Sequence, residues 1–387
     1  MAAARHCPSW ADLRPELLGL VLRRLPSLAD RVRLGAVCRA WHRIAAEEPL
    51  PPPLPWLTLL DGTFLNISDG EIHHMRVPED ASLHGSVGNW LFLRRLGGKL
   101  ALMNPFSKCV VGLPMKANGY YGDSIFFKLV PLSTLDLSSD SLFAVLILTS
   151  KWQCVISIGR RSSSAIAVQM PEYIFDIAFF EGKLYALSLK KLFAFEIVSS
   201  YEGGKPPSVS SIKHVANAVQ NPGIVCLAIA DKTYMSLYRS YLAESNGKLL
   251  QIRRLLRDLT ALPEDDSSED DNLEAKNFVT ISFEVFELDL TTNSHHKWRR
   301  LNTLGDQALF VGTYSKFLPA SECGAQENCI YFVCDYDREH WTADPFRDSG
   351  VFNMSNGTIT PLLPDTTVVR PQGCKGLPTW FFLTKTM

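Results

Sequence analysis

The apolar residues of this 387-residue chain change their spacing once, across a segment with five prolines in seven residues, Pro49 to Pro55. Before this segment the apolar spacing is helical. After it the spacing is two residues, interrupted by frequent turn signals. The prolines favour a polyproline II spacer, and an SH3-type ligand is the alternative because the segment also matches Pro-x-x-Pro. We therefore expect a small helical unit (residues 9–48), a linker (49–55) and a larger β unit (56–383).

The helical unit is predicted to contain two or three short helices. The apolar residues on one face of the first predicted helix are Leu13, Leu17, Leu18, Val21, Leu22 and Leu25. Those on one face of the second are Leu34, Val37, Cys38, Trp41 and Ile44. Pro26 and Pro49 end the two helices, and Asp30 is a suitable N-cap for the second. A unit of about 40 residues cannot bury a sufficient core alone, so it must pack on its own chain or offer its apolar face to a partner.

Two separated motifs in this unit resemble the F-box. They are Trp10-Ala-Asp-Leu-Arg-Pro-Glu-Leu-Leu18 with Leu25-Pro26, and Arg33-Leu-Gly-Ala-Val37-Cys38-Arg-Ala-Trp41. Their order and spacing agree with that family. One position departs from the pattern, because Arg14 stands where the F-box has a proline and Pro15 follows one place later.

The resemblance to the F-box implies a partner and a set of contact residues. F-box units bind a Skp-type adaptor, which ties them to a cullin-based ubiquitin ligase. The residues assigned to the adaptor contact are Leu13, Leu17, Leu18, Val21, Leu22, Leu25, Leu34, Val37, Cys38 and Trp41. We expect Arg14→Pro to tighten adaptor binding and Leu18→Asp to abolish it. The alternative is an amphipathic hairpin that packs on its own domain.

Residues 56–383 are predicted to form one all-β unit of about twenty short strands. Similar strands follow the turn glycines Gly98, Gly182 and Gly247, and Asn328 begins a fourth copy. Their spacing fits one or two units of about 40 residues, the size of a four-stranded blade. We therefore predict a kelch-like β-propeller after the all-α F-box, with a pair of β-sandwiches as the alternative.

Later segments of the β unit resemble the plant F-box proteins that carry a KIB-type β-propeller. The segments are Trp298–Leu301, Leu304–Gly312, Glu327–Asp335, Gly350–Met354 and Pro378–Phe381. The resemblance covers most of residues 56–383 and implies a propeller of this type. Within the unit, residues 262–276 hold seven acidic side chains and are predicted to form a solvated acidic loop. A phosphorylatable patch for a basic partner is the alternative interpretation of that loop.

Known catalytic and cofactor motifs do not occur in the sequence. It lacks the nucleophile elbow Gly-x-Ser-x-Gly, the P-loop, His-Glu-x-x-His and the dinucleotide fingerprint. Cys323, Cys329 and Cys334 have poor zinc spacing. The adjacent histidines at 73–74 and 295–296 would point to opposite faces of a strand. We therefore expect no catalytic residue, metal or cofactor, and no enzyme activity in this chain itself.

The charge balance favours proteins as partners. Thirty-nine lysines and arginines against 40 acidic residues leave a net charge of -1, which gives no broad attraction to nucleic acid or to an anionic membrane. No apolar run is long enough to span a membrane, and nine scattered cysteines favour a reducing compartment, the nucleus or the cytoplasm.

The function that the resemblance implies is the substrate-receptor subunit of a Skp–cullin–F-box ubiquitin ligase. Its target protein is not identified by any sequence motif. One alternative is a propeller enzyme or ligand sensor whose F-box-like hairpin is only structural. A second alternative is an F-box protein that acts outside proteolysis, as a scaffold or regulator.

Overall fold

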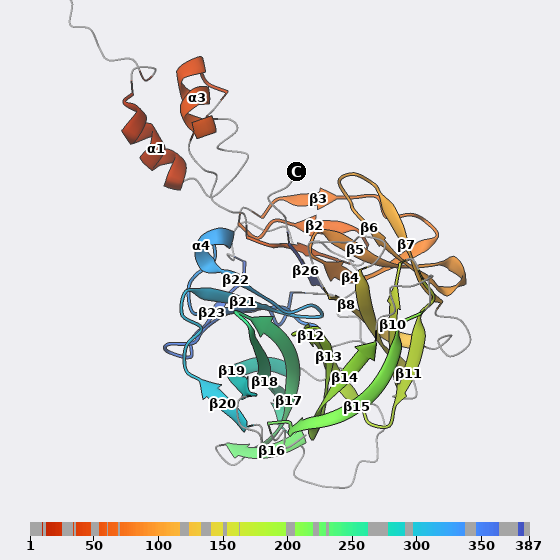
Figure 1. Cartoon of the computed structure of the whole chain (residues 1–387). Helices are drawn as coiled ribbons and strands as arrows, with labels where there is room; N and C mark the ends of the chain where they lie inside the picture. The colour runs from red at the N-terminus through yellow and green to blue at the C-terminus, as the bar shows by residue number, and fades with distance from the viewer. Residues whose placement is uncertain are drawn as a thin grey trace, which may run out of the picture.

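The computed structural model shows a pair of short helices near the N-terminus and a ring of β-sheets (Figure 1). The residues that the structure describes are 10, 13–24, 34, 36–47, 54–59, 61–68, 70–116, 124–132, 141–149, 153–161, 163–198, 206–219, 224–229, 232–261, 278–290, 297–336, 346–363 and 378–382. The predicted linker, apart from Leu54 and Pro55, and the predicted acidic loop lie outside these residues. None of the described helices is long and apolar enough to cross a membrane.

The helix pair consists of α1 (Pro15–Arg24) and α3 (Arg39–Glu47). The N–H groups of Leu17 and Leu18 donate to the carbonyl oxygen of Arg14, at 3.0 and 3.1 Å, so the hydrogen bonding of α1 begins at Arg14. Pro15 then occupies the first helical position, where the missing N–H costs nothing and the fixed φ favours the helix. The proline therefore lies where helix geometry favours it, one place later than in the F-box motif.

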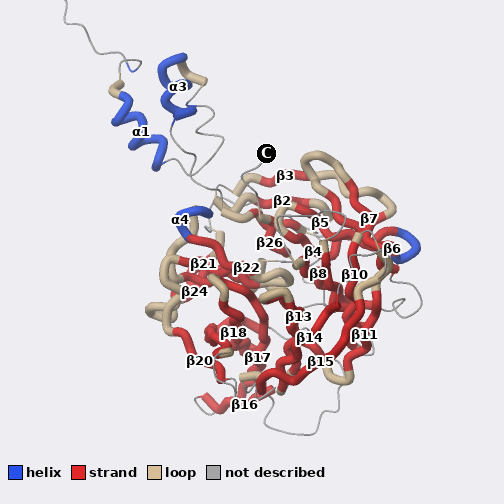
Figure 2. The backbone as a smooth tube through the Cα atoms, in the orientation of Figure 1, coloured by secondary structure: helices blue, strands red, loops and turns tan. Residues whose placement is uncertain are grey.

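In the described part of the chain, 26 strands form six sheets, which we call blades (Figure 2). The first blade contains β1 (Trp56–Thr58), β2 (Thr63–Leu65), β3 (Ile72–His74) and the C-terminal β26 (Thr379–Phe381). The second contains β4 (Ala81–Val87), β5 (Trp90–Arg95), β6 (Lys99–Met103) and β7 (Val110–Lys116), with the 3-10 helix η2 (Leu96–Gly98) before β6. The third contains β8 (Ser124–Pro131), β9 (Leu142–Thr149), β10 (Cys154–Arg160) and β11 (Ile166–Met170).

The remaining three blades are larger on average. The fourth contains β12 (Ile174–Phe180), β13 (Lys183–Ser188), β14 (Lys191–Val198) and β15 (Ser208–Asn217). The fifth contains β16 (Ile224–Ile229), β17 (Lys232–Ser245), β18 (Lys248–Ala261), β19 (Phe278–Asp289) and β20 (Lys297–Leu301). The sixth contains β21 (Gln307–Val311), β22 (Lys316–Pro319), β23 (Cys329–Phe332), β24 (Gly350–Asn353) and β25 (Ile359–Pro361). The short helix α4 (Ala320–Cys323) connects β22 to β23, which lets β23 pair parallel to β21.

The six blades form a closed β-propeller. Their inner strands contact one another in the order β26, β4, β8, β12, β17 and β22. The last strand, β26, pairs antiparallel with β1, so that Leu57 lies opposite Trp380 and the C-terminus completes the first blade. The prediction of a propeller is confirmed, and the alternative of a pair of β-sandwiches is wrong. The kelch-like subtype stays a prediction.

Trp380 joins three blades where the ring closes. Its side chain is 1% exposed, and its Nε1–H donates to the carbonyl oxygen of Val311 in the sixth blade at 2.9 Å. Its ring meets the ring of Phe310 edge-on, with 5.2 Å between centroids. The hydroxyl of Ser86 in the second blade donates to the Trp380 carbonyl. The closing strand is therefore held by hydrogen bonds as well as by apolar packing.

The predicted internal repeat marks tight turns. Gly98, Gly182, Gly247 and Asn328 all have positive φ, of 74, 75, 70 and 55°, a conformation that glycine adopts readily and asparagine tolerates. The strands that follow them do not occupy equivalent places, because β6 is third from the centre of its blade whereas β13 is second. The repeat therefore marked the turns correctly, and three of them, before β6, β13 and β18, are hairpins. The turn before β23 is not, because β23 pairs parallel with β21, and the repeat did not give the boundaries of the blades.

Candidate functional site

The helix pair has a small core of its own between α1 and α3. Leu18, Leu22 and Ile44 are buried in it, with 0, 1 and 7% of their surface exposed. The partly buried side chains around this core are Leu13, Leu34, Trp41 and Ala45. Leu18 and Leu22, two of the predicted adaptor contacts, therefore hold the two helices together instead of facing solvent.

A second set of apolar side chains in the helix pair is open to solvent. Leu17, Leu20 and Val21 of α1 are 46, 54 and 43% exposed. They follow the spacing i, i+3, i+4 and so lie on one face of the helix; we call these three residues the apolar stripe. Val37, two residues before the start of α3, is 63% exposed, and Trp10 is 78% exposed. Together these side chains leave apolar surface of the helix pair exposed to solvent.

The ten predicted adaptor-contact residues fall into groups that the sequence did not distinguish. Leu17, Val21 and Val37 are exposed; Leu13, Leu34, Cys38 and Trp41 are partly buried; Leu18 and Leu22 are buried; Leu25 lies outside the described residues. Sequence reasoning missed Leu20, although its spacing of three from Leu17 was a sufficient signal. Arg14 is exposed, so its charge is not buried where the F-box motif has a proline. Adaptor binding through these residues stays a prediction.

The propeller contains a cavity of about 340 Å³ that its inner strands line; we call it the central cavity. The polar residues among those that line it are Lys128, Glu244, Tyr314, Ser315 and Lys316. The ammonium group of Lys128 forms a buried ion pair with Asp176. The second carboxylate oxygen of Asp176 accepts the N–H of Leu242 at 2.8 Å. This network joins β8, β12 and β17 beside the cavity.

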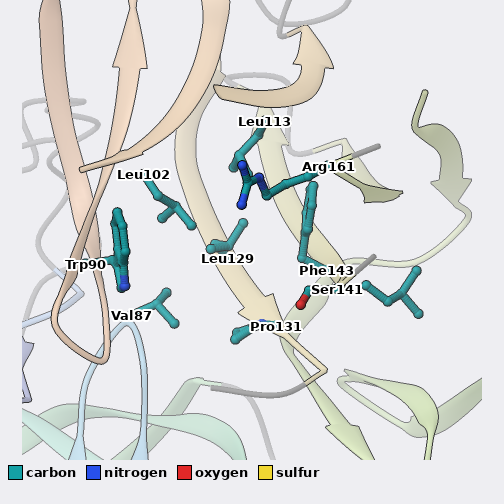
Figure 3. Close-up of a pocket in the computed structure, with 10 residues that line it drawn as sticks. Val87, Trp90, Leu102, Leu113, Leu129, Pro131, Ser141, Phe143 and Arg161 are labelled. Atoms are coloured by element: carbon teal, nitrogen blue, oxygen red, sulfur yellow. The ribbon is translucent and has the colours of Figure 1, made fainter. Parts of the chain in front are cut away.

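A second cavity lies between the second and third blades and is mainly apolar (Figure 3). Trp90 and Leu102 approach it from the second blade, and Leu129 and Phe143 approach it from the third. Its volume of about 10 Å³ is about the space that one water molecule needs. We therefore regard it as part of the packing between blades and not as a ligand site.

A buried arginine joins the fifth blade to the sixth. Arg254 has no exposed surface, and its Nη2 lies 2.7 Å from a carboxylate oxygen of Asp348. Its Nη1–H donates to the carbonyl oxygen of Val333 at 2.8 Å, and its Nε–H donates to the hydroxyl of Thr280 at 2.8 Å. Because the guanidinium is paired and hydrogen-bonded on every side, its charge is satisfied within the core.

Three buried thiols of the propeller are poor nucleophiles. Burial raises the pKa of Cys154, Cys323 and Cys329, and a thiol with a raised pKa carries little reactive thiolate at neutral pH. Among the residues that the structure describes, no group of three or more His, Cys, Asp or Glu side chains is placed to hold a metal ion. These cysteines pack as small apolar side chains.

Comparison with models of known protein families matches both units of the chain. The KIB1-4 beta-propeller model matches residues 64–353, which is most of the ring. The F-box-like model matches residues 7–50, which contain the helix pair.

Relatives among curated sequences are proteins of Arabidopsis thaliana that are named as putative, probable or plain F-box proteins. One is 22% identical to this chain over 92% of each sequence, and another is 21% identical over 85% of each. A third is 27% identical over 33% of this chain and 36% of its own length. Among solved structures, apo AztD from Citrobacter koseri is similar over 85% of this chain and 98% of its own. Its TM-score of 0.31 and identity of 10% are too low to carry an argument.

Proposed function

Because the chain belongs to the KIB1-4 beta-propeller family and carries an F-box-like unit, we propose that it is the substrate-receptor subunit of a Skp–cullin–F-box ubiquitin ligase. In this role the helix pair binds a Skp-type adaptor, and through it a cullin. The propeller recruits a target protein for ubiquitination and proteasomal degradation. The chain contributes proximity, because it raises the effective concentration of target lysines near the ubiquitin-charged enzyme.

The observation that carries this proposal is the apolar stripe on a unit that matches the F-box. Leu17, Leu20 and Val21 leave about half of their surface in water even though the neighbouring Leu18 and Leu22 are fully buried. Covering the rest of each side chain would contribute about 1 kcal/mol, roughly half of the value for complete burial. A partner that covers the stripe together with Val37 therefore gains from apolar surface that the chain leaves exposed.

Titration calorimetry with the full-length protein and a purified Skp-type adaptor tests the proposal. We expect the wild type to bind and Leu17→Asp to bind at least about tenfold more weakly, because a charge would be desolvated in the contact. The matched control is Leu96→Asp in η2 of the propeller, where the leucine is 84% exposed; this variant should bind as the wild type does. Equal binding by Leu17→Asp and the wild type would contradict the assigned surface.

The alternatives give different outcomes in the same system. If the helix pair is only structural, the wild type itself will not bind the adaptor. If the protein is a non-proteolytic scaffold, it will bind the adaptor but will not promote ubiquitin transfer to captured proteins in a reconstituted ligase. Transfer that requires both an intact apolar stripe and an intact propeller supports the substrate-receptor role.

A further inference from the structure

The central cavity is large enough for a ligand and is built by three blades and the chain that enters the sixth. Its volume of about 340 Å³ lies at the lower end of the usual range for ligand sites, about 300–1,000 Å³. Its lining residues come from β8, β12 and β17, and from the segment 314–317 that leads into β22. These inner strands surround the middle of the ring (Figure 1). A ligand here would contact several blades at once.

One of the two lysines at this cavity already has its counter-charge. Lys128 and Asp176 are both almost fully buried, with side-chain exposures of 4 and 3%, and they form an ion pair. The N–H groups of Leu242 and Ile177 both donate to the carboxylate of Asp176, each at 2.8 Å. This pair is therefore neutral as a whole and offers no unpaired charge to a ligand.

The other lysine, Lys316, lacks a counter-charge in the described part of the chain. Its ammonium group lies 5.1 Å from the centre of the Phe382 ring, and no described carboxylate lies within ion-pair distance of it. Burial lowers the pKa of Lys316, because the charged form is partly desolvated without a partner. An anion at this position would supply the missing interaction.

Tyr314 provides a second donor at the same cavity. Its ring packs edge-on against Phe382, with 6.3 Å between centroids, so Phe382 contacts both Tyr314 and Lys316. Burial raises the pKa of the Tyr314 hydroxyl, which keeps it protonated and able to donate. The described residues include no acceptor for this hydroxyl. By contrast, the hydroxyl of Ser315 already donates to the carbonyl oxygen of Gly312 at 3.3 Å.

We propose that Lys316 and Tyr314 form a binding site for a carboxylate group in the central cavity. A carboxylate carries one negative charge and two acceptor oxygens, which match one ammonium and one hydroxyl donor. A phosphate dianion is favoured by clusters of arginines, and here Glu244 lines the same cavity and adds a negative charge. The charges at the cavity thus favour a monoanion over a dianion.

The carboxylate is assigned to an aspartate or glutamate side chain of the protein that the propeller recruits. This assignment rests on the proposed function, whereas the site itself does not. The helix pair and the cavity use different residues, so adaptor binding and carboxylate binding can be measured separately. Loss of one without the other identifies which proposal has failed.

Reductive methylation of the full-length protein with isotopically labelled formaldehyde, read by mass spectrometry, measures the reactivity of Lys316 directly. A bound carboxylate stabilises the charged amine and should slow the labelling of Lys316. We expect propionate to protect Lys316 at concentrations on the order of millimolar, and the isosteric propionamide to give no protection. The exposed Lys108 is the internal control and should react at the same rate with either compound.

Three further comparisons in this experiment decide which chemical group the site binds and whether that group belongs to a protein. The blocked peptide Gly-Glu-Gly should protect Lys316, whereas Gly-Gln-Gly should not. Protection by propionate without protection by the glutamate peptide would overturn the assignment to a protein side chain. Stronger protection by inorganic phosphate than by propionate would overturn the choice of a carboxylate. Equal effects of propionate and propionamide, or no protection at all, would overturn the site.

Two variants test the individual donors by calorimetry with the glutamate peptide. Lys316→Met keeps the length of the side chain against Phe382 and should weaken binding at least about tenfold, as expected for the loss of a charged hydrogen bond. Tyr314→Phe keeps the ring and should weaken binding by a smaller factor, about threefold to tenfold. Both variants should keep the denaturant unfolding transition of the wild-type propeller, followed by circular dichroism, which shows that the propeller is folded. Unchanged peptide binding by Lys316→Met would contradict the proposal.

Discussion

The helix pair and the propeller bury their apolar side chains in different proportions. Among the described residues of the helix pair, three apolar residues are buried, and three more on α1 remain about half exposed. In the propeller, large aromatic side chains disappear completely from the surface. Among the described residues, those below 2% exposure are Phe64, Phe92, Phe195, Phe310, Phe332, Phe381 and Trp380. The helix pair therefore exposes a large part of its apolar surface, whereas the propeller buries most of its own.

This difference follows from how each unit is closed. The propeller completes its first blade with its own C-terminal strand, so that each blade has a neighbour on both sides. The helix pair is too small to bury both faces of α1. One face packs on α3, and the apolar stripe stays exposed to solvent.

The largest effect is expected where the ring closes. Trp380→Ala should destabilise the propeller by about 3–5 kcal/mol, because it leaves a cavity and removes the hydrogen bond to Val311. Denaturant unfolding followed by tryptophan fluorescence and circular dichroism measures this change. Trp10→Ala removes a tryptophan that is 78% exposed and should leave the unfolding of the propeller unchanged. Similar stability of the two variants would refute the importance of the closing strand.

A smaller effect, confined to one unit, is expected for Leu18→Asp. A carboxylate in the core between α1 and α3 should unfold the helix pair and therefore abolish adaptor binding. Hydrogen exchange read by mass spectrometry should show lost protection in residues 15–24 and 39–47. The transition of the propeller should stay as in the wild type.

Leu17→Asp is the matched control for this prediction, because the charge enters one position away on the exposed side of the same helix. It should retain the protection of both helices and still lose adaptor binding. If Leu18→Asp also lowered the stability of the propeller, the two units would unfold together and the contrast between them would be wrong.

Strands with strong alternation or continuous apolar character could be predicted from the sequence. Strand β9, Leu142–Thr149, is buried along its whole length, and its run of apolar residues has few other interpretations. Strand β4, Ala81–Val87, cannot be predicted in this way, because its mixed polar and small residues show no period. Strand β22, Lys316–Pro319, has four residues and ends in proline. The pairing of β26 with β1 joins residues more than 300 positions apart, and local patterns carry no information about such a pairing.

The candidate sites were predictable only as far as they are local. Helical spacing identified the apolar residues of α1, but Leu17 and Leu18 differ by only 100° around the helix, and the position of α3 decides which of them is buried. The cavity lysine Lys316 gave no signal in the sequence. Its lack of a counter-charge depends on which side chains β8, β12 and β17 bring together at the cavity. It also depends on the ion pair of Asp176 with Lys128, which leaves that carboxylate neutralised.

The smallest effect is expected at the surface of the propeller. It tests whether the closing strand β26 and the packed core contribute most of the free energy of unfolding. Glu172 accepts hydrogen bonds from Lys191, at 2.8 Å, and from the hydroxyl of Ser188, at 2.7 Å. The hydrogen bond from Lys191 is the main cause that holds the pKa of Glu172 below its ordinary value of 4.5. Because Lys191 is 43% exposed, solvent screens the pair, and Glu172→Gln should cost only about 0.5 kcal/mol at pH 7.

The pH dependence of this small effect has a definite sign. A carboxyl group whose pKa is lower in the folded state stabilises the fold at a pH above its unfolded value. The difference between the wild type and Glu172→Gln should therefore be complete near pH 7 and should disappear as the pH falls below 4.5. Urea unfolding at pH 7 and at pH 4 measures it, with Glu79→Gln, at an exposed position, as the control that should show no such change. A loss of several kcal/mol on replacing Glu172 would mean that these surface contacts in the fourth blade stabilise the propeller as much as the closing strand and the core do.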